Sequence, residues 1–237
     1  MLVPRRRRGH ELLDDPAVPA DVAERSLRDV ARSNVLFGGR HAVLRTLDAL
    51  LPTLGPRATL LDVGTGLGDI PAAARRLAAR KGVALTTIGV DLRASLAAAS
   101  RARIGEAVCA DALALPFADG AIDVVTCSQT LHHFTEDDGV RVLRELTRVA
   151  RVGVVVGDLR RSWLAASLFW LVSWPLGFHR ITRHDGVLSV LRGFTADELR
   201  ALADRAGASA PSVRRSLGWR LAASWSPPGA APRGRSA

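Results

Sequence analysis

Apolar and polar residues follow a regular order over the middle of the chain. Short apolar runs that suit buried strands alternate with segments in which apolar residues recur at helical spacing. The expected strands are 59–63, 84–90, 107–110, 122–127 and 153–157, and the expected helices are 71–80, 94–103 and 136–150. This order predicts an α/β fold with a mostly parallel sheet and right-handed crossovers.

Further elements are expected before and after this core. Two amphipathic helices, about 21–36 and 40–51, precede the first strand, where they are placed to form a lid over a ligand. Near the end of the chain, the pattern Thr195-Ala-Asp-Glu198 is a capping box and predicts a helix to about residue 206. Two closing strands, 212–217 and 219–225, are joined by a tight turn and are expected to be antiparallel to part of the sheet.

The length and composition favour one large domain. The 237 residues are 48% apolar, which is enough for a substantial core. The expected divisions are a basic, flexible arm (1–20), a single domain (21–225) with lid helices (21–51) and a substrate cap (159–191), and a disordered tail (226–237). The tail contains only proline, glycine, serine, alanine and arginine and has no apolar periodicity.

A glycine-rich loop follows the first strand of the core. Gly64, Gly66 and Gly68 stand at every second position, where they permit positive φ and the close approach of a ligand to the backbone. A helix begins directly afterwards, so the loop predicts a nucleotide-type site at the carboxyl ends of the strands. The spacing departs from the dinucleotide fingerprint, and the carboxylate of Asp69 would repel a pyrophosphate. Asp62 and Asp69 instead suit a ligand with a cationic end and neutral hydroxyls, such as S-adenosylmethionine.

The net charge of +10 is compatible with nucleic-acid binding, but its distribution argues against it. Six of the positive charges lie in Arg5–Arg8, Arg233 and Arg235, near the two ends of the chain. Acids between residues 9 and 15 interrupt the apolar run that a signal peptide requires. We therefore expect a cytoplasmic protein with a mildly basic surface.

The two cysteines give no sign of a disulfide or a zinc site. Cys109 and Cys127 both lie in apolar, strand-like runs, and no Cys-x-x-Cys pattern occurs. Reduced, buried thiols are expected for both residues.

Three further segments strengthen the interpretation of the glycine loop. An acid, Asp91, closes the second strand, Asp111 stands in Cys-Ala-Asp-Ala-Leu-Ala-Leu-Pro-Phe, and residues 123–134 read Asp-Val-Val-Thr-Cys-Ser-Gln-Thr-Leu-His-His-Phe. With the glycine loop, these segments resemble the class I S-adenosylmethionine-dependent methyltransferases. The branch is the one that acts on small molecules and includes the ubiquinone and menaquinone methyltransferases. The resemblance covers about 59–150 and continues weakly to 225. It implies a Rossmann-like, mostly parallel seven-stranded sheet with helices on both faces.

The resemblance also assigns cofactor-binding residues. The glycine backbone would follow the methionine part of S-adenosylmethionine, and Asp91 would accept hydrogen bonds from both ribose hydroxyls. Leu92 would pack on the adenine, and the Asp111 carboxylate would accept from its amine. The full set implied for the cofactor is Asp62, Gly64, Thr65, Gly66, Gly68, Asp91, Leu92, Asp111, Ala112, Ser128 and Gln129.

Few polar residues are available for catalysis. Methyl transfer is an in-line displacement, so the protein aligns the reactants and removes a proton where the acceptor requires it. His132 and His133 follow the fourth strand, and analogy with relatives favours His132 on the substrate side. His184, beside Asp185, is the third candidate base. A hydrogen-bonded structural histidine is the alternative for each.

The segment 159–191 lies where this family inserts its substrate cap, and it is rich in aromatic residues. The apolar part is about 17 residues long and contains Pro175, so it is short for a membrane span of roughly 20 residues. We expect a substrate lid, and a lid that also contacts a membrane surface is the alternative. The expected substrate-binding residues are Arg40, His132, Trp163, Phe169, Trp170, Arg183 and His184.

The function expected from this resemblance is methyl transfer to an oxygen or carbon of a hydrophobic small molecule, either aromatic, polyketide, quinone or isoprenoid-like. An RNA methyltransferase and a non-catalytic cofactor-binding subunit of a biosynthetic complex are the alternatives. No metal is indicated, because the acids are assigned to the cofactor and no further His/Asp cluster is apparent. A monomer and a homodimer are both compatible with the sequence.

Overall fold

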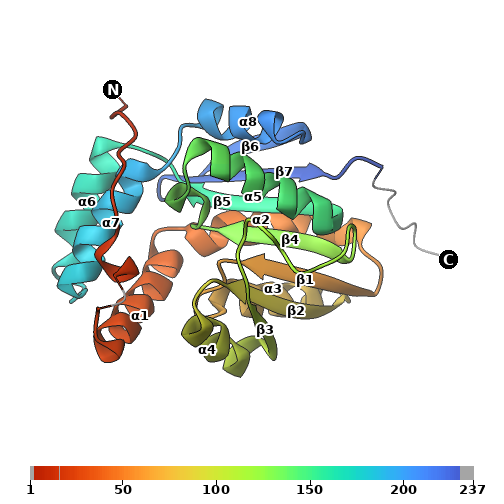
Figure 1. Cartoon of the computed structure of the whole chain (residues 1–237), viewed down its shortest axis with the longest axis horizontal. Coiled ribbons are helices and arrows are strands. Elements are labelled where there is room, and N and C mark those ends of the chain that lie inside the picture. Colours follow the sequence, from red (N-terminus) through yellow and green to blue (C-terminus); the bar gives the residue numbers. More distant parts are fainter. Residues whose placement is uncertain (1–2, 16, 230–237) are drawn as a thin grey trace.

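The computed structural model describes residues 3–15 and 17–229. Its strands form one sheet in the order β3-β2-β1-β4-β5-β7-β6 (Figure 1). The strands are β1 (Arg57–Val63), β2 (Ala84–Asp91), β3 (Glu106–Cys109), β4 (Ile122–Ser128), β5 (Ala150–Leu159), β6 (Ser209–Ser216) and β7 (Arg220–Ser226). The predicted strands are therefore confirmed, with ends that differ by a few residues.

The pairing of the strands confirms the predicted topology. The pairs β1–β2, β2–β3, β1–β4 and β4–β5 are parallel, and β7 lies antiparallel between β5 and β6. The chain adds strands on one side of β1 and then crosses to add β4 on the other side. This reversal creates a crevice at the carboxyl ends of β1 and β4, where open α/β sheets bind their ligands.

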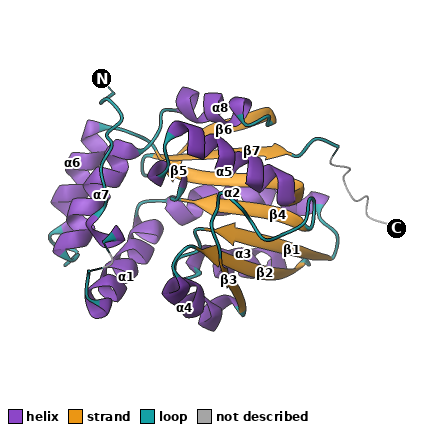
Figure 2. Ribbon diagram, in the orientation of Figure 1, coloured by secondary structure: helices purple, strands orange, loops and turns teal. Residues whose placement is uncertain are grey.

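Helices cover both faces of the sheet (Figure 2). The helices are α1 (Ala20–Leu36), α2 (Gly39–Leu50), α3 (Asp69–Arg80), α4 (Ala94–Ile104), α5 (Glu136–Val149), α6 (Trp163–Ser173), α7 (Arg180–Arg192) and α8 (Ala196–Arg205). Apolar residues of α5 and α8 pack in one core cluster, and those of α2 and α3 pack in another. The capping box of α8 is formed as predicted, between Thr195 and Glu198.

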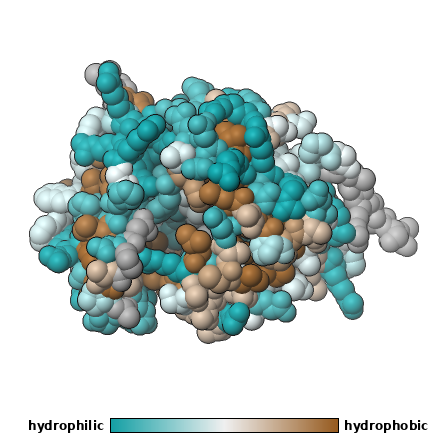
Figure 3. All heavy atoms as spheres, in the orientation of Figure 1, coloured by the Kyte–Doolittle hydropathy of each residue, from teal (hydrophilic) through white to brown (hydrophobic). Residues whose placement is uncertain are grey.

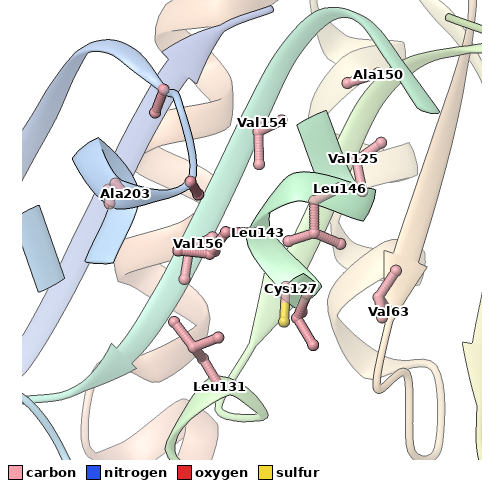
Figure 4. Close-up of a cluster of buried hydrophobic side chains, with 14 of the residues drawn as sticks. Val63, Val125, Cys127, Leu131, Leu143, Leu146, Ala150, Val154, Val156 and Ala203 are labelled. Atoms are coloured by element: carbon pink, nitrogen blue, oxygen red, sulfur yellow. The ribbon is translucent and has the colours of Figure 1, made fainter. Parts of the chain in front are cut away.

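The central strands are buried on both faces, which explains their continuous apolar runs. On one face, Val125 and Cys127 of β4 lie beside Val156 of β5 and contribute to the same cluster as Leu143 and Leu146 of α5 (Figure 4). These five side chains are at most 1% exposed. The sheet is thus a rigid platform for the loops at its carboxyl ends.

Helices α1, α6 and α7 lie together beyond one end of the sheet and form a cap (Figure 1). Helix α6 ends at Ser173, two residues before Pro175, as the proline predicts. The N-terminal segment 3–15 contacts this cap: the N–H groups of Leu12 and Leu13 donate to the carboxylate of Asp185, each at 2.8 Å.

This placement of residues 3–15 differs from the free arm expected from the sequence. The Arg6 guanidinium lies 4.3 Å from the Phe194 ring centroid, and its Nε donates to the Arg192 carbonyl at 2.8 Å. Backbone groups and arginine side chains make these contacts, so apolar periodicity gives no sign of them. The division of the chain into arm, domain and tail stays a prediction, and residues 230–237 of the tail lie outside the described residues.

The surface corrects one expectation about the cysteines. Cys127 is buried, but Cys109 is exposed, because β3 is an edge strand of the sheet. The face in Figure 3 is mainly hydrophilic with hydrophobic patches. Among the described helices, none combines the length and apolar character that crossing a membrane requires.

Candidate functional site

Two adjoining cavities lie at the carboxyl ends of the strands. The first, here called the loop cavity, has a volume of about 490 Å³ and is lined by the glycine loop and the ends of β2 and β4. The second, the cap cavity, has a volume of about 300 Å³ and lies among α1, α6, α7 and the segment after β4. Residues shared by both walls are Glu11, Leu13, Val30, Gln129 and His133. A ligand in each cavity would therefore meet the other at this common wall.

The glycine loop has the backbone geometry that its sequence predicts. The φ angles of Gly64, Gly66 and Gly68 are +73°, +53° and +72°. The N–H groups of Gly64 and Thr65 donate to the Val90 carbonyl at 2.8 and 2.9 Å, which fixes the loop to the end of β2. Of the loop residues predicted to bind cofactor, Gly64, Thr65 and Gly66 line the loop cavity, whereas Gly68 lies behind it against α4.

Gly64→Ala tests this close packing. A Cβ at residue 64 would overlap the Thr130 side chain, and alanine is strained at a φ of +73°. We expect the variant to lose at least about 2 kcal/mol of unfolding free energy, since both overpacking and strained backbone cost about 1–3 kcal/mol. Urea unfolding measures this loss. Gly82→Ala is the control, because Gly82 also has positive φ but has open space at its Cβ position. Equal losses in the two variants would contradict the packing argument.

Asp91 stands at the end of β2 with its carboxylate in the loop cavity. One oxygen accepts the Gly66 N–H at 2.9 Å, and the other accepts the Arg93 N–H at 3.1 Å. Burial raises the pKa of this carboxyl group above its ordinary value. The two backbone bonds orient the carboxylate and leave further lone pairs for a ligand.

The side of the loop cavity near the ends of β2 and β3 contains other residues predicted to bind the cofactor. Leu92, Asp111 and Ala112 line it, and Leu92 is 72% exposed. Asp111 accepts the Leu113 N–H at 2.9 Å, which turns the chain after β3. Ser128 and Gln129 complete the wall at the end of β4.

Gln129 has an unusual backbone conformation for a residue other than glycine, with a φ of +54°. Its side-chain NH2 group donates to the side-chain oxygen Oδ1 of Asn34 in α1, and its Oε1 accepts from Arg220 at 3.0 Å. These bonds tie β4 to the cap at the wall that both cavities share.

Asp69 is the strongest sign of a cationic ligand. It lines the loop cavity, and its Oδ2 atom is buried without a hydrogen-bond partner. Burial raises the pKa of Asp69 and outweighs the groups around it that stabilise its ionised form, so this form would gain from further stabilisation. A positively charged ligand group would supply it. The two carboxylate oxygens of Asp91 thus suit hydroxyl groups at one end of a ligand, and the acid at Asp69 suits a cationic group at the other end.

Asp62 lies outside both cavities, contrary to a role as a direct ligand. The residue is 2% exposed, and its Oδ1 accepts the Thr126 hydroxyl at 2.6 Å. Burial is the main cause that raises its pKa to about 7. The residue supports the loop from within the sheet.

The raised pKa of Asp62 predicts a pH dependence of stability. The folded protein holds the Asp62 proton up to about pH 7, whereas an unfolded chain releases it near 3.8. This contribution to the unfolding free energy is therefore full below pH 4 and decreases as pH rises to about 7. The stability of the wild type relative to Asp62→Asn should fall over this range, by up to about 4 kcal/mol. Urea unfolding without cofactor at pH 4.5 and 7.5 measures it, and a constant difference would contradict the assignment.

The two histidines after β4 form a charged cluster with Glu11. Nδ1 of His132 lies 2.7 Å from Asp158, and its Nε2 lies 3.7 Å from Glu11 Oε1. Nε2 of His133 lies 3.8 Å from Glu11 Oε2. Burial opposes charge on the His132 ring, but the charge of Asp158 and the contacts of Glu11 outweigh it and raise the His132 pKa to about 9. Glu11 is also buried, which opposes its charge, yet the nearby imidazoles of His132 and His133 lower its pKa to about 2.

The cap cavity contains only some of the residues predicted for substrate. His132 and Phe169 line it, and His133 lines both cavities. His184 is exposed and pairs with Asp185 at 2.8 Å. The residues that lie outside both cavities are Arg40, Trp163, Trp170, Arg183 and His184. The roles of these five residues stay predictions. Helical geometry explains why only one of the two neighbouring aromatic residues of α6 lines the cavity: Phe169 points inward, while Trp170 is 51% exposed.

The structure also brings in residues that sequence reasoning missed. Glu11 comes from the supposed arm, and Asp158 stands near the carboxyl end of β5, where the rule that identified Asp91 applies equally. Arg220 lines the cap cavity and donates to the Phe37 carbonyl and to Gln129, each at 3.0 Å. Burial lowers the pKa of Arg220 to about 10. No His/acid cluster is predicted from the sequence, but Glu11, His132 and His133 form one.

Comparisons with known proteins agree with this geometry. Residues 61–156 match a family model described as a methyltransferase domain. A ubiquinone/menaquinone biosynthesis C-methyltransferase (UbiE) of Dinoroseobacter shibae is 38% identical over 131 residues, 51% of this chain and 49% of that protein. A tRNA (carboxymethyluridine(34)-5-O)-methyltransferase of Xenopus tropicalis is 33% identical over 115 residues, 48% of this chain and 17% of that protein. The chain thus spans about half of the first relative and less of the second.

A solved structure extends the agreement to the whole fold. The S-adenosylmethionine-dependent methyltransferase SibL, in its apo form, superposes with a TM-score of 0.66 at 17% identity, over 94% of this chain and 63% of SibL. The superposition confirms the predicted Rossmann-like fold class. The predicted cofactor, S-adenosylmethionine, agrees with the match to a methyltransferase domain and with the hydrogen-bond acceptors that Asp91 and Asp69 place in the loop cavity.

Proposed function

We propose that the chain is a class I S-adenosylmethionine-dependent methyltransferase, since residues 61–156 match a methyltransferase domain. It would methylate an oxygen or carbon of a hydrophobic small molecule. The acceptor would occupy the cap cavity, and the cofactor would occupy the loop cavity. An aromatic or quinone-like acceptor fits best, and the name of the Dinoroseobacter shibae relative supports a quinone.

The observation that carries this proposal is the apolar cap cavity against the common wall. Side chains such as Leu36, Phe37, Leu168, Phe169 and Val172 line it and suit an apolar ligand. S-adenosylmethionine supplies an electrophilic methyl group when bound. The residues of the common wall, Gln129 and His133, would hold the acceptor in line with that methyl group.

The charges in the cap cavity bear on the acceptor as well. Arg220 is buried, and among the described residues no carboxylate lies within 4.0 Å of its guanidinium. Within the described part of the chain, its hydrogen bonds use Nε and Nη1. The charge of Asp158 acts on Arg220 but does not outweigh its burial, so this cation favours an acceptor with an acidic hydroxyl, whose anion Arg220 would stabilise. Such an acceptor would be methylated as its phenolate or enolate.

A labelled-methyl assay tests the function. Purified protein and methyl-labelled S-adenosylmethionine would be incubated with phenols, hydroquinones, isoprenoid lipids and tRNA in separate reactions. We expect label in an apolar phenol or hydroquinone. Label transferred to tRNA instead would support the RNA methyltransferase and overturn the proposal. Cofactor binding without transfer to any acceptor would support a non-catalytic subunit.

Phe169→Trp tests whether the acceptor occupies the cap cavity. The larger ring would fill part of a cavity of about 300 Å³ without reaching the loop cavity. We expect KM for the acceptor to rise at least about tenfold, since the change excludes apolar contact area, while the affinity for S-adenosylhomocysteine stays the same. Trp170→Phe, on the exposed side of α6, is the matched control. Unchanged KM in Phe169→Trp would place the acceptor elsewhere.

The outer side of α6 and the residue that follows it support the alternative of a lid that also contacts a membrane surface. Trp170, Leu171 and Trp174 are 51%, 60% and 53% exposed, and Arg183 lies 3.8 Å from the Trp174 ring centroid. Apolar rings beside an arginine suit an anionic lipid interface. Sedimentation with phosphatidylglycerol vesicles would detect the contact, and Trp170→Ser with Trp174→Ser should abolish it. Equal sedimentation of this double variant would exclude it.

A further inference from the structure

Three potential metal ligands converge where the two cavities meet. Glu11 enters from the N-terminal segment, and His132 and His133 follow β4. One ligand atom of each lies within 4.8 Å of the other two. Glu11 is nearly central, at 3.7 Å from His132 Nε2 and 3.8 Å from His133 Nε2. A zinc ion with bonds of about 2.0–2.1 Å would hold such atoms roughly 3.3 Å apart, so small side-chain shifts would close the site.

His132 supplies an independent sign of a missing partner. Its side chain is 2% exposed, and its Nε2 atom is buried with no hydrogen bond. The other ring nitrogen, Nδ1, is held by the Asp158 carboxylate at 2.7 Å. In metal sites, ligating histidines are oriented in this way, with a carboxylate on the nitrogen that does not bind the ion. The ring is thus fixed with Nε2 toward Glu11.

The surroundings of Glu11 hold its carboxylate in place. Ser189 donates its hydroxyl to Oε1 at 2.6 Å. Arg192 lies 3.5 Å from the same oxygen, while its Nε and Nη2 donate to the carbonyls of His132 and His133. Arg192 thereby fixes the backbone of both histidines.

We infer that Glu11, His132 and His133 form a binding site for a divalent transition-metal cation, with Zn²⁺ as the best match. Two imidazoles and one carboxylate suit Zn²⁺ and Fe²⁺, whereas Mg²⁺ and Ca²⁺ prefer oxygen ligands alone. Three protein ligands leave at least one coordination position open, and both cavities border it.

The open position gives the site a use that rests on the proposed function. An acidic hydroxyl of the acceptor would coordinate there and ionise, because a Lewis-acidic cation lowers the pKa of a bound oxygen. The proton leaves to solvent, and the oxygen stays bound as an anion. The residues of the site would then position the acceptor rather than remove its proton directly.

Cobalt titration tests the site without an acceptor or turnover. Protein freed of metal by a chelator would be titrated with Co²⁺ and followed by visible absorption, and bound zinc would be counted by elemental analysis after Zn²⁺ loading and desalting. We expect one equivalent of Zn²⁺ and a Co²⁺ band. Glu11→Gln and His133→Ala should weaken Co²⁺ binding at least about tenfold, and Asp158→Asn by about 10-fold to 100-fold through the orientation of His132.

His41→Ala is the matched control, since His41 is an exposed histidine of α2 and should bind Co²⁺ like the wild type. Far-ultraviolet circular dichroism of each variant verifies that the fold is intact. Absence of a Co²⁺ band in wild type, or the same Co²⁺ affinity in wild type, Glu11→Gln and His133→Ala, would overturn the inference. Either result would leave the proposed methyl transfer untouched, because the labelled-methyl assay tests it separately.

Discussion

Asp91→Asn is expected to weaken S-adenosylhomocysteine binding by about 100-fold or more while the protein stays folded. The carboxylate is oriented by the N–H groups of Gly66 and Arg93 and faces the loop cavity. Two ribose hydroxyls would donate to it, and hydrogen bonds to a charged group contribute about 1.5–3 kcal/mol each. Asparagine retains the shape but replaces one acceptor with a donor. Isothermal titration calorimetry measures the dissociation constant.

The control for this prediction is Asp48→Asn. Asp48 is a partly exposed acid of α2 that pairs with Lys81 at 3.4 Å. It is distant from Asp91 in the sequence and has no role in the loop cavity. This variant should bind S-adenosylhomocysteine with the affinity of the wild type. If Asp91→Asn also binds like the wild type, the ribose lies elsewhere and the residue assignment taken from the family is wrong for this chain.

The sequence predicts the sheet well because its signals are local. The apolar runs of β1, β4 and β5 and the helical periods between them are each visible in a short window. Turns that require glycine, such as Gly64 and Gly218, are visible for the same reason. Cys109 shows the limit: an apolar run does not tell a central strand from an edge strand, and β3 is at the edge.

Residues that line the loop cavity could be predicted from the sequence, but several that line the cap cavity could not. Asp91 and Asp111 follow strands and line the loop cavity, so strand position alone identifies them. The cap cavity is formed by segments distant in sequence, and Glu11 reaches His132 across 121 positions. Contacts of this kind depend on tertiary packing and leave no periodic pattern. Aromatic content identified the cap, but only the fold shows that Phe169 faces inward.

Asp158 is expected to be the acid whose loss costs the most stability. It is 1% exposed and accepts three hydrogen bonds, from the backbone N–H and Nδ1 of His132 and from the Leu159 N–H. The charge of His132 lowers the Asp158 pKa against the effect of burial. Removing one partner of a buried charged pair leaves the other uncompensated, at a cost of about 3–5 kcal/mol.

Asp158→Ala should therefore lower the unfolding free energy by about 3–5 kcal/mol at pH 7 in the absence of metal and cofactor. Urea unfolding followed by tryptophan fluorescence measures this change. Asp119→Ala is the comparison, because Asp119 is 80% exposed in its ion pair with Arg148 and such pairs contribute at most about 1 kcal/mol. A loss below 1 kcal/mol in Asp158→Ala would mean that His132 is neutral in the folded protein. Asp158 would then orient the imidazole without compensating a charge.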